Sequence, residues 1–449
     1  MAKHCDVVVI GAGVAGLAAA VQLGGAGLSV SILEARDRIG GRIFTQREPG
    51  LETPVELGAE FIHGKPAEIW DLLTKSNVSI SEVEGENWCS TNGVPCPCGF
   101  FGLLDKILKK MDGSGADESF QDFLDRCWRN PSGDPKLEEA RQRALAYVTG
   151  FNAADPGLVG LHWLVQGMRA EEQIEGDRAF RAAGGYASLV EILEQAATLA
   201  SVAINNGAVV EAIRWKAGLA EVAGQRAGVP FVTSAPRVLV TLPLAVLQAT
   251  PGQLGAIEFS PALPQQKLEA LHKLEMGKII RVVFRFRRRF WDEFSPADAD
   301  GKTLSRMSFL FSDDDWFPTW WTTMPDQAPA ITAWAPFHSA ERLSGKDKAF
   351  VIQQGLRSLG RILGLSVRIL KTEFEAAYFH DWQSDPFSRG AYSYGKVGSD
   401  GAAQALGKPA ANTLFFAGEA TDTSGNTGTV HGAIASGLRA ASEILSAVQ

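Results

Sequence analysis

The chain has 449 residues, of which 45% are hydrophobic, and this is enough for two domains with a large core. Charged residues make up 21% and the formal net charge is −8, whereas a nucleic-acid-binding protein would more often be basic overall. No apolar run approaches the ~20 residues of a membrane-spanning helix, and we recognise no secretory signal or tail anchor. We therefore expect a cytoplasmic protein that binds neither nucleic acid nor membrane.

The first predicted elements are a strand, a glycine-rich turn and a helix. In "CDVVVIGAGVAGLAAAVQL" the run "DVVVI" is typical of a strand buried on both faces, and "AGLAAAVQL" is typical of a helix. Between them, Gly11, Gly13 and Gly16 have the G-x-G-x-x-G spacing. Gly11 permits a tight turn, Gly13 lets the backbone approach a pyrophosphate, and Gly16 lets helix and strand pack closely. The first helical turn offers its unpaired N–H groups to that anion.

The second predicted strand, "LSVSIL", ends at Glu34, and a carboxylate in this place can accept the ribose hydroxyls of an adenosine. A glycine triplet alone is often only a tight turn. Here strand, triplet, helix, strand and acid follow one another in the order that a dinucleotide site requires. We therefore predict a dinucleotide-binding site.

A second glycine pair follows in "RDRIGGR", residues 36–42, where Arg38 and Arg42 place cations just beyond the ribose position. On a surface these arginines would be ordinary, but directly after Glu34 they suggest a further phosphate contact. This Arg-x-Gly-Gly-Arg stretch resembles the flavin family that includes amine oxidases, phytoene desaturases and L-amino-acid oxidases. The resemblance runs from residue 5 to about 445 and is weakest between 85 and 180. It implies that FAD occupies the dinucleotide site.

The segment "ELGAEFIHG", residues 56–64, resembles the part of polyamine oxidases that passes under the flavin. Glu60 could pair with a distal ammonium of a diamine or polyamine, or it could be a structural or exposed acid near the flavin. His63 could contact the substrate or cap a turn. L-amino-acid oxidases have a carboxylate-binding arginine at the place of Phe61, which argues against an α-amino acid, although an arginine from elsewhere could substitute.

The middle of the chain alternates helical and strand patterns. "FFGLLDKILKKM" and "LEEARQRALAYV" have helical periodicity, and they predict a mostly helical lobe. "GAVVEAIRW" resembles the strand whose Val210 backbone meets the adenine of FAD. The tryptophan-rich "WFPTWWTTM" is expected to place Trp316, Trp320 and Trp321 in the core rather than in a substrate wall.

The stretch "MGKIIRVVFRFRRRFW", residues 276–291, contains six basic residues. Side chains alternate across a strand, and this places Ile280, Val282, Phe284 and Phe286 on one face and Arg281, Arg285, Arg287 and Arg289 on the other. The pattern predicts a half-buried strand with a solvated basic face. The run "RFRRR" could alternatively bind an acidic partner, and such an association would depend on salt.

Lys278 has the parity of the buried face of this strand. The stretch resembles the Gly-x-x-x-Lys strand of polyamine oxidases that ends in Phe-Trp, except that here the glycine precedes the lysine directly. The resemblance implies that Lys278 holds a water next to the reactive nitrogen of the flavin. The alternative is a lysine at the strand end that extends to solvent.

The segment "DPFSRGAYSYGKVGS" resembles the Arg-Gly-Ser-Tyr-Ser-Tyr segment of spermine oxidases and lysine-specific histone demethylases. Monoamine oxidases have a cysteine, covalently joined to FAD, directly before the first tyrosine of the substrate cage. Here Ala391 precedes Tyr392, which implies a non-covalent flavin. The second cage tyrosine corresponds to Thr429, so we expect a half-aromatic cage that attracts a cation, unless Tyr392 is only core packing.

The last pattern, "NTLFFAGEATDTSGNTGTVHGAIASGLRAASEIL", predicts a buried strand, a Gly-Glu turn, a loop and a helix, which could also form without any ligand. The resemblance places Glu419 on the ribityl chain and the helix start at the isoalloxazine ring. The residues that it implies for the cofactor are Gly11, Gly13, Ala15, Gly16, Glu34, Ala35, Arg36, Gly41, Arg42, Gly58, Ala59, Glu60, Val210, Trp382, Gly418, Glu419, Thr429 and Val430. Those that it implies for catalysis are Lys278, Tyr392, Thr429, Glu60 and His63.

The cysteines show no metal motif. Their number, five, is odd, and Cys96 and Cys98 flank a single proline in "VPCPCG". A zinc site would normally need a second matching pair, and the sequence has none. We therefore predict reduced thiols and no metal site.

The predicted fold is α/β, with an FAD-binding Rossmann-like (two-dinucleotide-binding-domain) fold interleaved with an α+β substrate-binding domain. Residues 1–75, 186–270 and 389–449 are assigned to the FAD-binding domain. Residues 76–185, the helical lobe, and 271–388, a sheet, are assigned to the substrate-binding domain. Histone demethylases add a long helical hairpin and an N-terminal helical module, and we expect neither here.

The resemblance implies a flavin-dependent amine oxidase. It would oxidise the C–N bond of a primary or secondary amine, preferably a diamine or polyamine, to an imine and then an aldehyde, with dioxygen as acceptor and hydrogen peroxide as product. The alternatives are a monoamine oxidase or L-amino-acid oxidase, a desaturase of the same fold with a wide apolar tunnel, and a flavin-bound scaffold without activity. The sequence does not indicate the oligomeric state.

Overall fold

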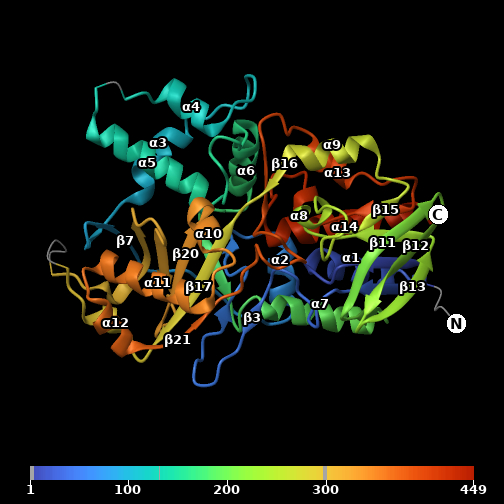
Figure 1. The fold of residues 1–449 in the computed structure, drawn as a ribbon, viewed down its shortest axis with the longest axis horizontal. Coiled ribbons are helices and arrows are strands. Elements are labelled where there is room, and N and C mark those ends of the chain that lie inside the picture. Colours follow the sequence, from blue (N-terminus) through green and yellow to red (C-terminus); the bar gives the residue numbers. More distant parts are fainter. Residues whose placement is uncertain (1–4, 131, 297–300, 449) are drawn as a thin grey trace.

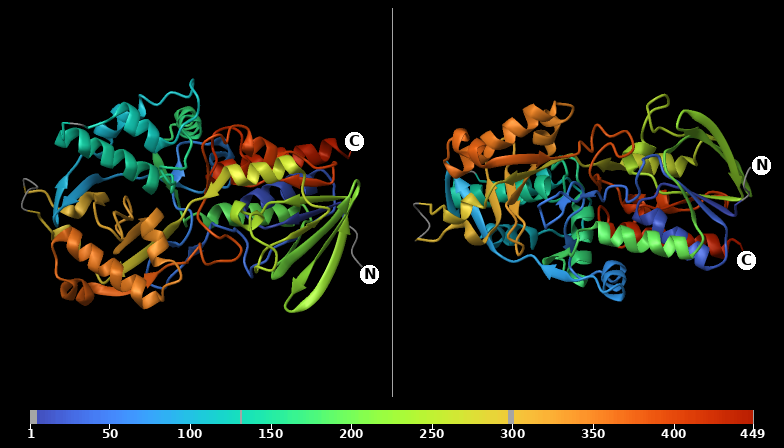
Figure 2. Two further views of the ribbon diagram at one scale, coloured as in Figure 1. Left: turned by 45° about the horizontal axis from the view of Figure 1, so that its top comes forward. Right: turned by 90° about the horizontal axis from the view of Figure 1, so that it is seen from below.

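The computed structural model describes residues 5–130, 132–296 and 301–448. The chain forms two halves that lie end to end (Figure 1). We call the half that carries both chain ends the terminal half and the other the distal half. The turned views of Figure 2 show the same elongated arrangement, in which segments from several parts of the sequence cross between the halves.

The terminal half is built on a parallel sheet. Its five strands follow the order β10 (Ala203–Asn205), β2 (Val30–Leu33), β1 (Val7–Ile10), β14 (Arg237–Val240) and β23 (Leu414–Phe416). Val7 and Val9 pack with helices α1 (Val14–Gly25), α7 (Ala187–Leu199) and α14 (Val430–Ser446). Val8 and Ile10 pack instead toward a second sheet of β13 (Val229–Ala235), β12 (Leu219–Arg226), β11 (Ala208–Lys216) and β15 (Glu258–Ser260). The strand is therefore buried on both faces, as its β-branched run predicts.

Shorter elements complete the terminal half and connect it to the distal half. They are β3 (Thr45–Gln46), β4 (Val55–Glu56), β5 (Ile62–His63), α2 (Ala67–Lys75), β6 (Ile80–Glu82), β9 (Ala179–Ala182), α8 (Leu244–Leu247), α9 (Gln265–Lys273), β16 (Leu274–Met276), β22 (Ser393–Gly395), α13 (Ala402–Gly407) and η3 (Glu419–Thr421). β16 pairs with β22, so the segment before residue 277 runs beside the segment after residue 392.

The distal half contains a mostly antiparallel sheet of seven strands. Their order is β21 (Phe374–Tyr378), β17 (Ile279–Phe286), β20 (Ala330–Pro336), β19 (Thr319–Thr322), β18 (Met307–Ser312), β7 (Glu86–Thr91) and β8 (Val94–Pro97). Helices α10 (Phe337–Leu343), α11 (Lys348–Leu363) and α12 (Val367–Glu373) and the short turns η1 (Phe290–Glu293) and η2 (Leu304–Arg306) accompany it. Phe284, Trp291 and Trp320 are fully buried in its core.

The helical lobe forms the upper part of the distal half in Figure 1 and consists of α3 (Phe100–Leu108), α4 (Phe120–Cys127), α5 (Pro135–Gly150) and α6 (Leu161–Gln173). The two helices expected from periodicity are thus confirmed as α3 and α5. Asp134 caps α5 by accepting from the Lys136 N–H, and Pro135 occupies the first helical position. Phe120, Phe123 and other apolar residues give the lobe its own core.

The basic strand β17 differs from its prediction at its start. Ile280, Val282, Phe284 and Phe286 are buried as expected. Arg281 is also buried, because residues 55–60 cover the other face of the strand, where Val283 packs against Val55 and Leu57. The expectation of a wholly solvated basic face is therefore wrong.

The arginines toward and beyond the end of β17 are largely neutralised. The ion pairs are Arg285–Glu375, Arg288–Glu293, Arg288–Glu373 and Arg289–Asp292. Cations that are already paired in this way offer little charge to an acidic partner. The alternative of a partner-binding surface on "RFRRR" thus loses its main support.

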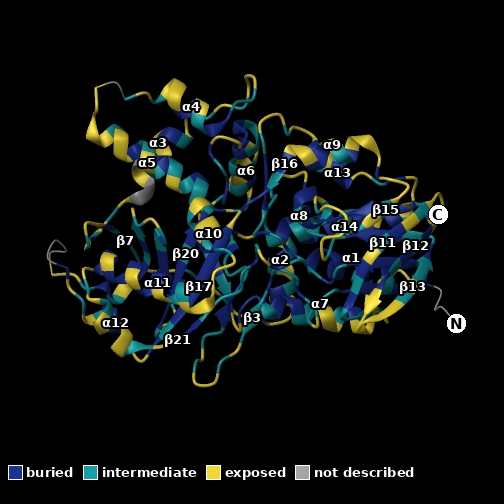
Figure 3. Cartoon of the chain, viewed as in Figure 1, coloured by how far each residue is buried: buried dark blue, intermediate teal, exposed yellow. Residues whose placement is uncertain are grey.

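Burial follows the architecture, with buried residues concentrated in the strands and between the halves and exposed residues on outer helix turns such as those of α5 and α9 (Figure 3). None of the described helices combines the length and the apolar character needed to cross a bilayer.

Cys89 of β7 and Cys98, just after β8, form a disulfide, while Cys5, Cys96 and Cys127 are free. The expectation that all cysteines are reduced thiols is wrong, because the hairpin brings two of them together across its strands. The disulfide removes the cysteine-based argument for a cytoplasmic protein, and the compartment remains a prediction.

Candidate active site

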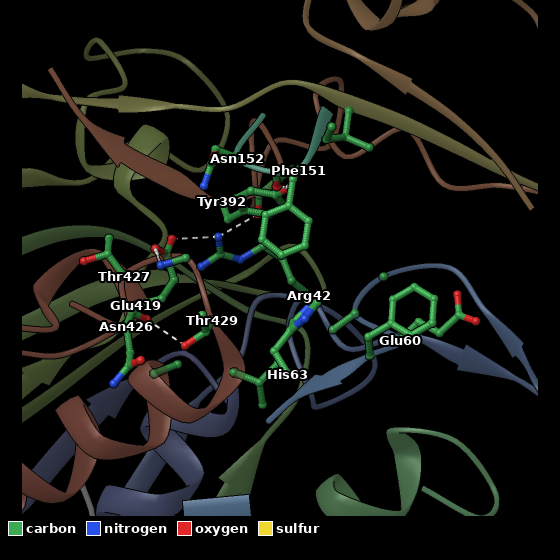
Figure 4. A pocket seen from close by; sticks show the side chains of 18 of the residues that line it. Arg42, Glu60, His63, Phe151, Asn152, Tyr392, Glu419, Asn426, Thr427 and Thr429 are labelled. Atoms are coloured by element: carbon green, nitrogen blue, oxygen red, sulfur yellow. Dashed lines mark hydrogen bonds and ion pairs between the residues drawn. The ribbon is translucent and has the colours of Figure 1, made fainter. Parts of the chain in front are cut away.

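A cavity of about 1460 Å³ lies where the terminal half meets the sheet and the helical lobe of the distal half. Sites for a single small molecule are usually about 300–1,000 Å³, so this cavity has room for a dinucleotide and a second ligand. Its walls come from β1 and α1, residues 40–43 and 57–63, α5, α6, β17, β19 and the segments around residues 382–392 and 418–433. Figure 4 shows its central part.

The nucleotide end of the cavity is formed by the glycine turn and the start of α1. Gly11 has a φ of +104°, and a Cβ there would lie 2.7 Å from the Thr241 hydroxyl. A Cβ at Gly16 would lie 2.1 Å from the Gly11 carbonyl oxygen, so Gly16 allows the close packing expected of it. Gly13 has open space before it and is an N-cap without a side-chain acceptor. The first N–H groups of α1 can therefore hold an anion.

Glu34 follows β2 and is buried in the cavity wall. Its carboxylate accepts from the Ala12 N–H at 2.7 Å and from the Arg36 N–H at 3.0 Å. These bonds fix the carboxylate at the end of the strand and leave it acceptor capacity for a ribose diol. Arg36 is held in turn by Asp385 at 2.8 Å.

Arg42 connects the second glycine pair to the C-terminal turn (Figure 4). Its guanidinium donates to the Ala391 carbonyl at 2.8 Å and to Glu419 at 2.9 Å. Glu419 also accepts from the Ser393 hydroxyl at 2.6 Å and from the Gly428 N–H at 3.0 Å. Glu419 therefore lines the cavity and at the same time holds three segments together.

Helix α14 begins at the cavity wall. Its N-cap, Thr429, accepts from the Gly432 N–H at 2.9 Å and donates to the Asn426 carbonyl at 2.6 Å. Thr429 and Val430 both line the cavity. The positive end of the α14 dipole is therefore available to an electron-rich ligand.

The predicted cofactor residues meet in one place. Those that line the cavity are Gly11, Gly13, Ala15, Glu34, Ala35, Arg36, Gly41, Arg42, Gly58, Ala59, Glu60, Val210, Trp382, Gly418, Glu419, Thr429 and Val430. Gly16 does not line it and serves helix packing instead. A dinucleotide flavin needs open helix N–H groups for its pyrophosphate, an acid at a strand end for its ribose and a helix N-terminus for its ring. The cavity provides all three, so the residues present fit FAD.

An aromatic wall adjoins this cradle (Figure 4). The Tyr392 hydroxyl donates to the Phe151 carbonyl at 2.6 Å. The ring of Phe151 lies 5.3 Å from that of His63 and stacks at 5.3 Å on Tyr147. All four residues line the cavity, so Tyr392 and His63 lie where contact with a substrate is expected. The substrate-contact roles expected of Tyr392 and His63 remain predictions.

Glu60 lies in the wall but is not free. Its carboxylate pairs with Arg181 at 2.7 Å and with Arg281, and it accepts from the Trp321 indole N–H at 3.0 Å. Burial acts to raise the pKa of Glu60, but the charges of Arg281 and Arg181 outweigh it and lower the pKa. Of the two alternatives for Glu60, these contacts favour a structural acid over a carboxylate free to bind a distal ammonium. Trp321, expected in the core, lines the cavity.

Lys278 is not among the residues that line the cavity. Its side chain is 46% exposed and pairs with Glu341 of α10 at 2.6 Å. Because β17 begins at Ile279, the alternation that placed Lys278 on the buried face does not apply, and its expected position beside the cofactor is wrong. Arg281, four residues after Gly277, where the resembling strand has its lysine, reaches the wall instead.

Two imidazoles line the cavity, the half-buried His63 and the buried His431. Burial lowers the pKa of His63 to about 4, and burial together with His63 lowers that of His431 to about 4. Both rings are therefore neutral near pH 7 and add no positive charge beside the aromatic wall. The buried Nε2 of His431 has no hydrogen-bond partner among the described residues.

Glu171 of α6 also lines the cavity, and burial raises its pKa to about 7. Its side chain makes no ion pair or hydrogen bond with any residue in the described part of the chain. By contrast, every arginine in the described lining is paired. The pairs are Arg36–Asp385, Arg42–Glu419, Arg178–Glu82, Arg178–Glu175 and Arg281–Glu60. The described lining therefore contains an unpaired carboxyl group at Glu171, and its cation without an ion pair is the exposed Lys109 rather than an arginine.

Sequence reasoning missed several residues of the site. Arg281 could have been found by counting four residues from Gly277. Phe151 and Glu171 lie in or beside the lobe, where the family resemblance is weakest, and no local pattern marks them. No group of three or more His, Cys, Asp or Glu side chains that could hold a metal ion occurs among the described residues.

Comparisons with known sequences agree with the geometry. The family profile "Flavin containing amine oxidoreductase" matches residues 14–98 and 99–445. The chain is 30% identical to a lysine-specific histone demethylase 1 homolog 2 of Arabidopsis thaliana over 98% of this chain and 58% of that protein. It is 25% identical to polyamine oxidase 4 of Oryza sativa subsp. japonica over 98% and 88% of the two chains. The chain spans between 30% and 58% of the length of the curated lysine-specific histone demethylase homologs that it matches.

Solved structures share the fold. A putrescine oxidase bound to putrescine superposes with a TM-score of 0.78 at 22% identity, covering 99% of both chains. Cyclohexylamine oxidase from Brevibacterium oxydans IH-35A gives 0.77 at 19% identity, again over 99% of both. These likenesses confirm the predicted fold class.

Proposed function

The chain belongs to the family of flavin-containing amine oxidoreductases, and we propose that it is an oxidase of a primary or secondary amine, with a diamine or polyamine preferred. The observation that carries this proposal is the charge pattern of the cavity. A cradle that fits FAD opens onto an aromatic wall, every lining arginine is paired, and the carboxylate of Glu171 is not. Such a surface suits a cationic substrate.

The proposed reaction removes two electrons and two protons from one C–N bond of the amine. The resulting imine is hydrolysed by water to an aldehyde and a shorter amine or ammonia. Dioxygen takes up the two electrons and two protons and becomes hydrogen peroxide. When bound, the flavin supplies the electron chemistry between amine and dioxygen.

The chain's own residues hold and position the reactants. The open N–H groups at the start of α1 and the fixed carboxylate of Glu34 hold the dinucleotide. Tyr392 and Phe151 form a wall that orients the amine and keeps water from it. Arg181 and Arg281 around Glu60 leave this cluster with a net positive charge. That charge disfavours an ammonium nearby, so the reacting nitrogen there more readily becomes the neutral amine that can be oxidised.

Two alternatives fit the cavity less well. An L-amino-acid oxidase needs a cation for the substrate carboxylate, but Arg281 is committed to Glu60 and to the Gly58 carbonyl. Lys109, which has no ion pair in the described lining, lies exposed at the end of α3. A desaturase needs an apolar tunnel, whereas exposed acids such as Glu84, Asp105 and Asp177 line the outer part of this cavity.

An anaerobic flavin-bleaching screen tests the proposal. The holoenzyme is mixed without oxygen with monoamines, diamines, polyamines and L-amino acids, and the flavin absorbance is followed. We expect bleaching by amines and the formation of hydrogen peroxide when air is readmitted. Dithionite serves as the control that the flavin is reducible. Reduction by dithionite but by no amine would refute the proposed function.

A further inference from the structure

One carboxylate in the cavity differs from the other buried acids. Glu34, Glu56, Glu60 and Glu419 each accept hydrogen bonds from backbone, hydroxyl or guanidinium donors. Glu171 has no such donor in the described structure, and its side chain is half-buried in the cavity wall. Because folding leaves an acid half-buried and unpaired only at a cost, a missing partner suggests a ligand.

The surroundings of Glu171 suit an ammonium group. Glu171 lies close enough to Tyr147 for its charge to raise the pKa of that phenol, which burial already raises. Tyr147 stacks on Phe151, whose carbonyl holds the Tyr392 hydroxyl. The acid thus adjoins the same aromatic wall that leads to the cofactor cradle. A cation bound by Glu171 would lie near the ring of Tyr147, at the edge of this aromatic wall.

The other charged cluster of the wall has the opposite sign. Glu60 is bound by both Arg181 and Arg281, and the Gly58 carbonyl accepts from Arg281 at 2.7 Å. The adjoining Ala59 N–H donates to the Arg42 carbonyl, so the cluster borders the cofactor cradle. A substrate with two nitrogens is therefore favoured in one orientation, with its charged nitrogen toward Glu171 and its neutral nitrogen toward the cradle.

We propose that Glu171 is a specificity-determining residue that binds the second, charged amino group of the substrate. This inference rests on the proposed function and adds the residue that would select a diamine or polyamine, by binding a distal nitrogen that stays protonated. Glu171 is assigned here the role that the sequence suggested for Glu60. A charge-assisted bond of this kind is worth roughly tenfold to a hundredfold in affinity.

The test compares matched substrates and matched variants. Glu171→Gln keeps the shape of the side chain and removes its charge. Glu194→Gln makes the same change on the exposed surface of α7, outside the cavity. For wild type and both variants, the dissociation constant and the limiting rate of anaerobic flavin reduction are measured with butane-1,4-diamine and with butylamine. Calorimetry measures diamine binding independently of turnover.

We expect Glu171→Gln to weaken butane-1,4-diamine at least tenfold and butylamine less than twofold, with the limiting rates nearly unchanged. Glu194→Gln should affect neither substrate. An equal loss of affinity for both amines would overturn the role of Glu171. So would an unchanged affinity for the diamine in both the kinetic and the calorimetric measurement. If no amine reduces the wild-type flavin, the proposed function fails, while calorimetry still decides whether Glu171 binds the diamine.

Discussion

Replacing Glu171 by glutamine should stabilise the fold at alkaline pH. Burial raises the pKa of Glu171 from 4.5 to about 7, so the folded protein holds this proton more tightly than the unfolded chain does. The stability cost of the charged form is absent below about pH 4.5, grows as the pH rises, and is complete above about pH 7. Glutamine never carries the charge, so the variant escapes this cost at pH 8 and gains little at pH 5.

The size of the change in the free energy of unfolding follows from the shift in the pKa of Glu171. A difference between 4.5 and about 7 corresponds to about 3 kcal/mol, at about 1.4 kcal/mol for each pH unit. Solvent screening reduces this value because the side chain is only half-buried, so we expect a gain of about 1–3 kcal/mol in the free energy of unfolding at pH 8. For a chain of this size such a gain raises the melting temperature by a few degrees.

The same substitution at Glu60 should have the opposite sign. Glu60→Gln leaves Arg181 and Arg281 close together without their shared counter-ion. Removing one partner of a buried ion pair costs about 3–5 kcal/mol. Because the pKa of Glu60 is lowered, its carboxylate is charged at both pH 5 and pH 8, so the loss should be similar at the two values.

Thermal unfolding of the holoenzymes at pH 5 and pH 8, with excess FAD and without amine, measures both effects. Glu194→Gln is the control for a lost surface charge. His63 and His431, whose pKa values are about 4, are mainly neutral at both values and do not mask the result. A lower melting temperature of Glu171→Gln at pH 8, or an equal rise at pH 5, would refute the reasoning.

Three further experiments test other parts of the site. Arg281→Met should destabilise the protein and slow anaerobic flavin reduction at least tenfold. Lys278→Met should change that rate less than twofold, because the Lys278 ammonium only pairs with Glu341 at the surface. Stopped-flow absorbance measures both rates, and equal rates for the two variants would restore Lys278 as a candidate catalytic residue. Acid precipitation should release all the flavin into the supernatant, because Ala391 offers no nucleophile, and a yellow pellet would contradict this. Glu34→Ala should weaken FAD at least tenfold by fluorescence titration, and unchanged affinity would show that Glu34 only supports the turn.

The nucleotide end could be predicted from sequence because short-range sterics decide it. Gly11 needs a positive φ, and Gly16 leaves no room for a Cβ beside the Gly11 carbonyl. The β-branched run around Val8 packs on both faces, as such runs do. Each requirement acts within a few residues, so spacing alone predicts the turn, the helix and the acid at Glu34.

The charged part of the wall could not be predicted in this way. Alternation along β17 placed Lys278 inside, but the strand begins one residue later, and the side chain extends to Glu341. Arg281 seemed solvated because nothing local shows that residues 55–60 cover that face. Which of two acids stays free is likewise decided by contacts between segments far apart in sequence, such as that of Glu60 with Arg181.

Glu171, which is unpaired, and Glu60, which is paired, have different roles that a single carboxylate could not combine. Glu60, bound by two arginines, stabilises the wall and cannot also bind a substrate cation. While the cavity lacks a cation, the charged form of Glu171 lowers the free energy of unfolding. An ammonium that binds Glu171 only in the folded protein raises the free energy of unfolding again, and the same interaction contributes to the affinity for the substrate. The stability that Glu171→Gln gains without ligand and the diamine affinity that it loses should therefore have one origin. A saturating diamine should then bring the wild type closer to the variant in melting temperature, and butylamine should not.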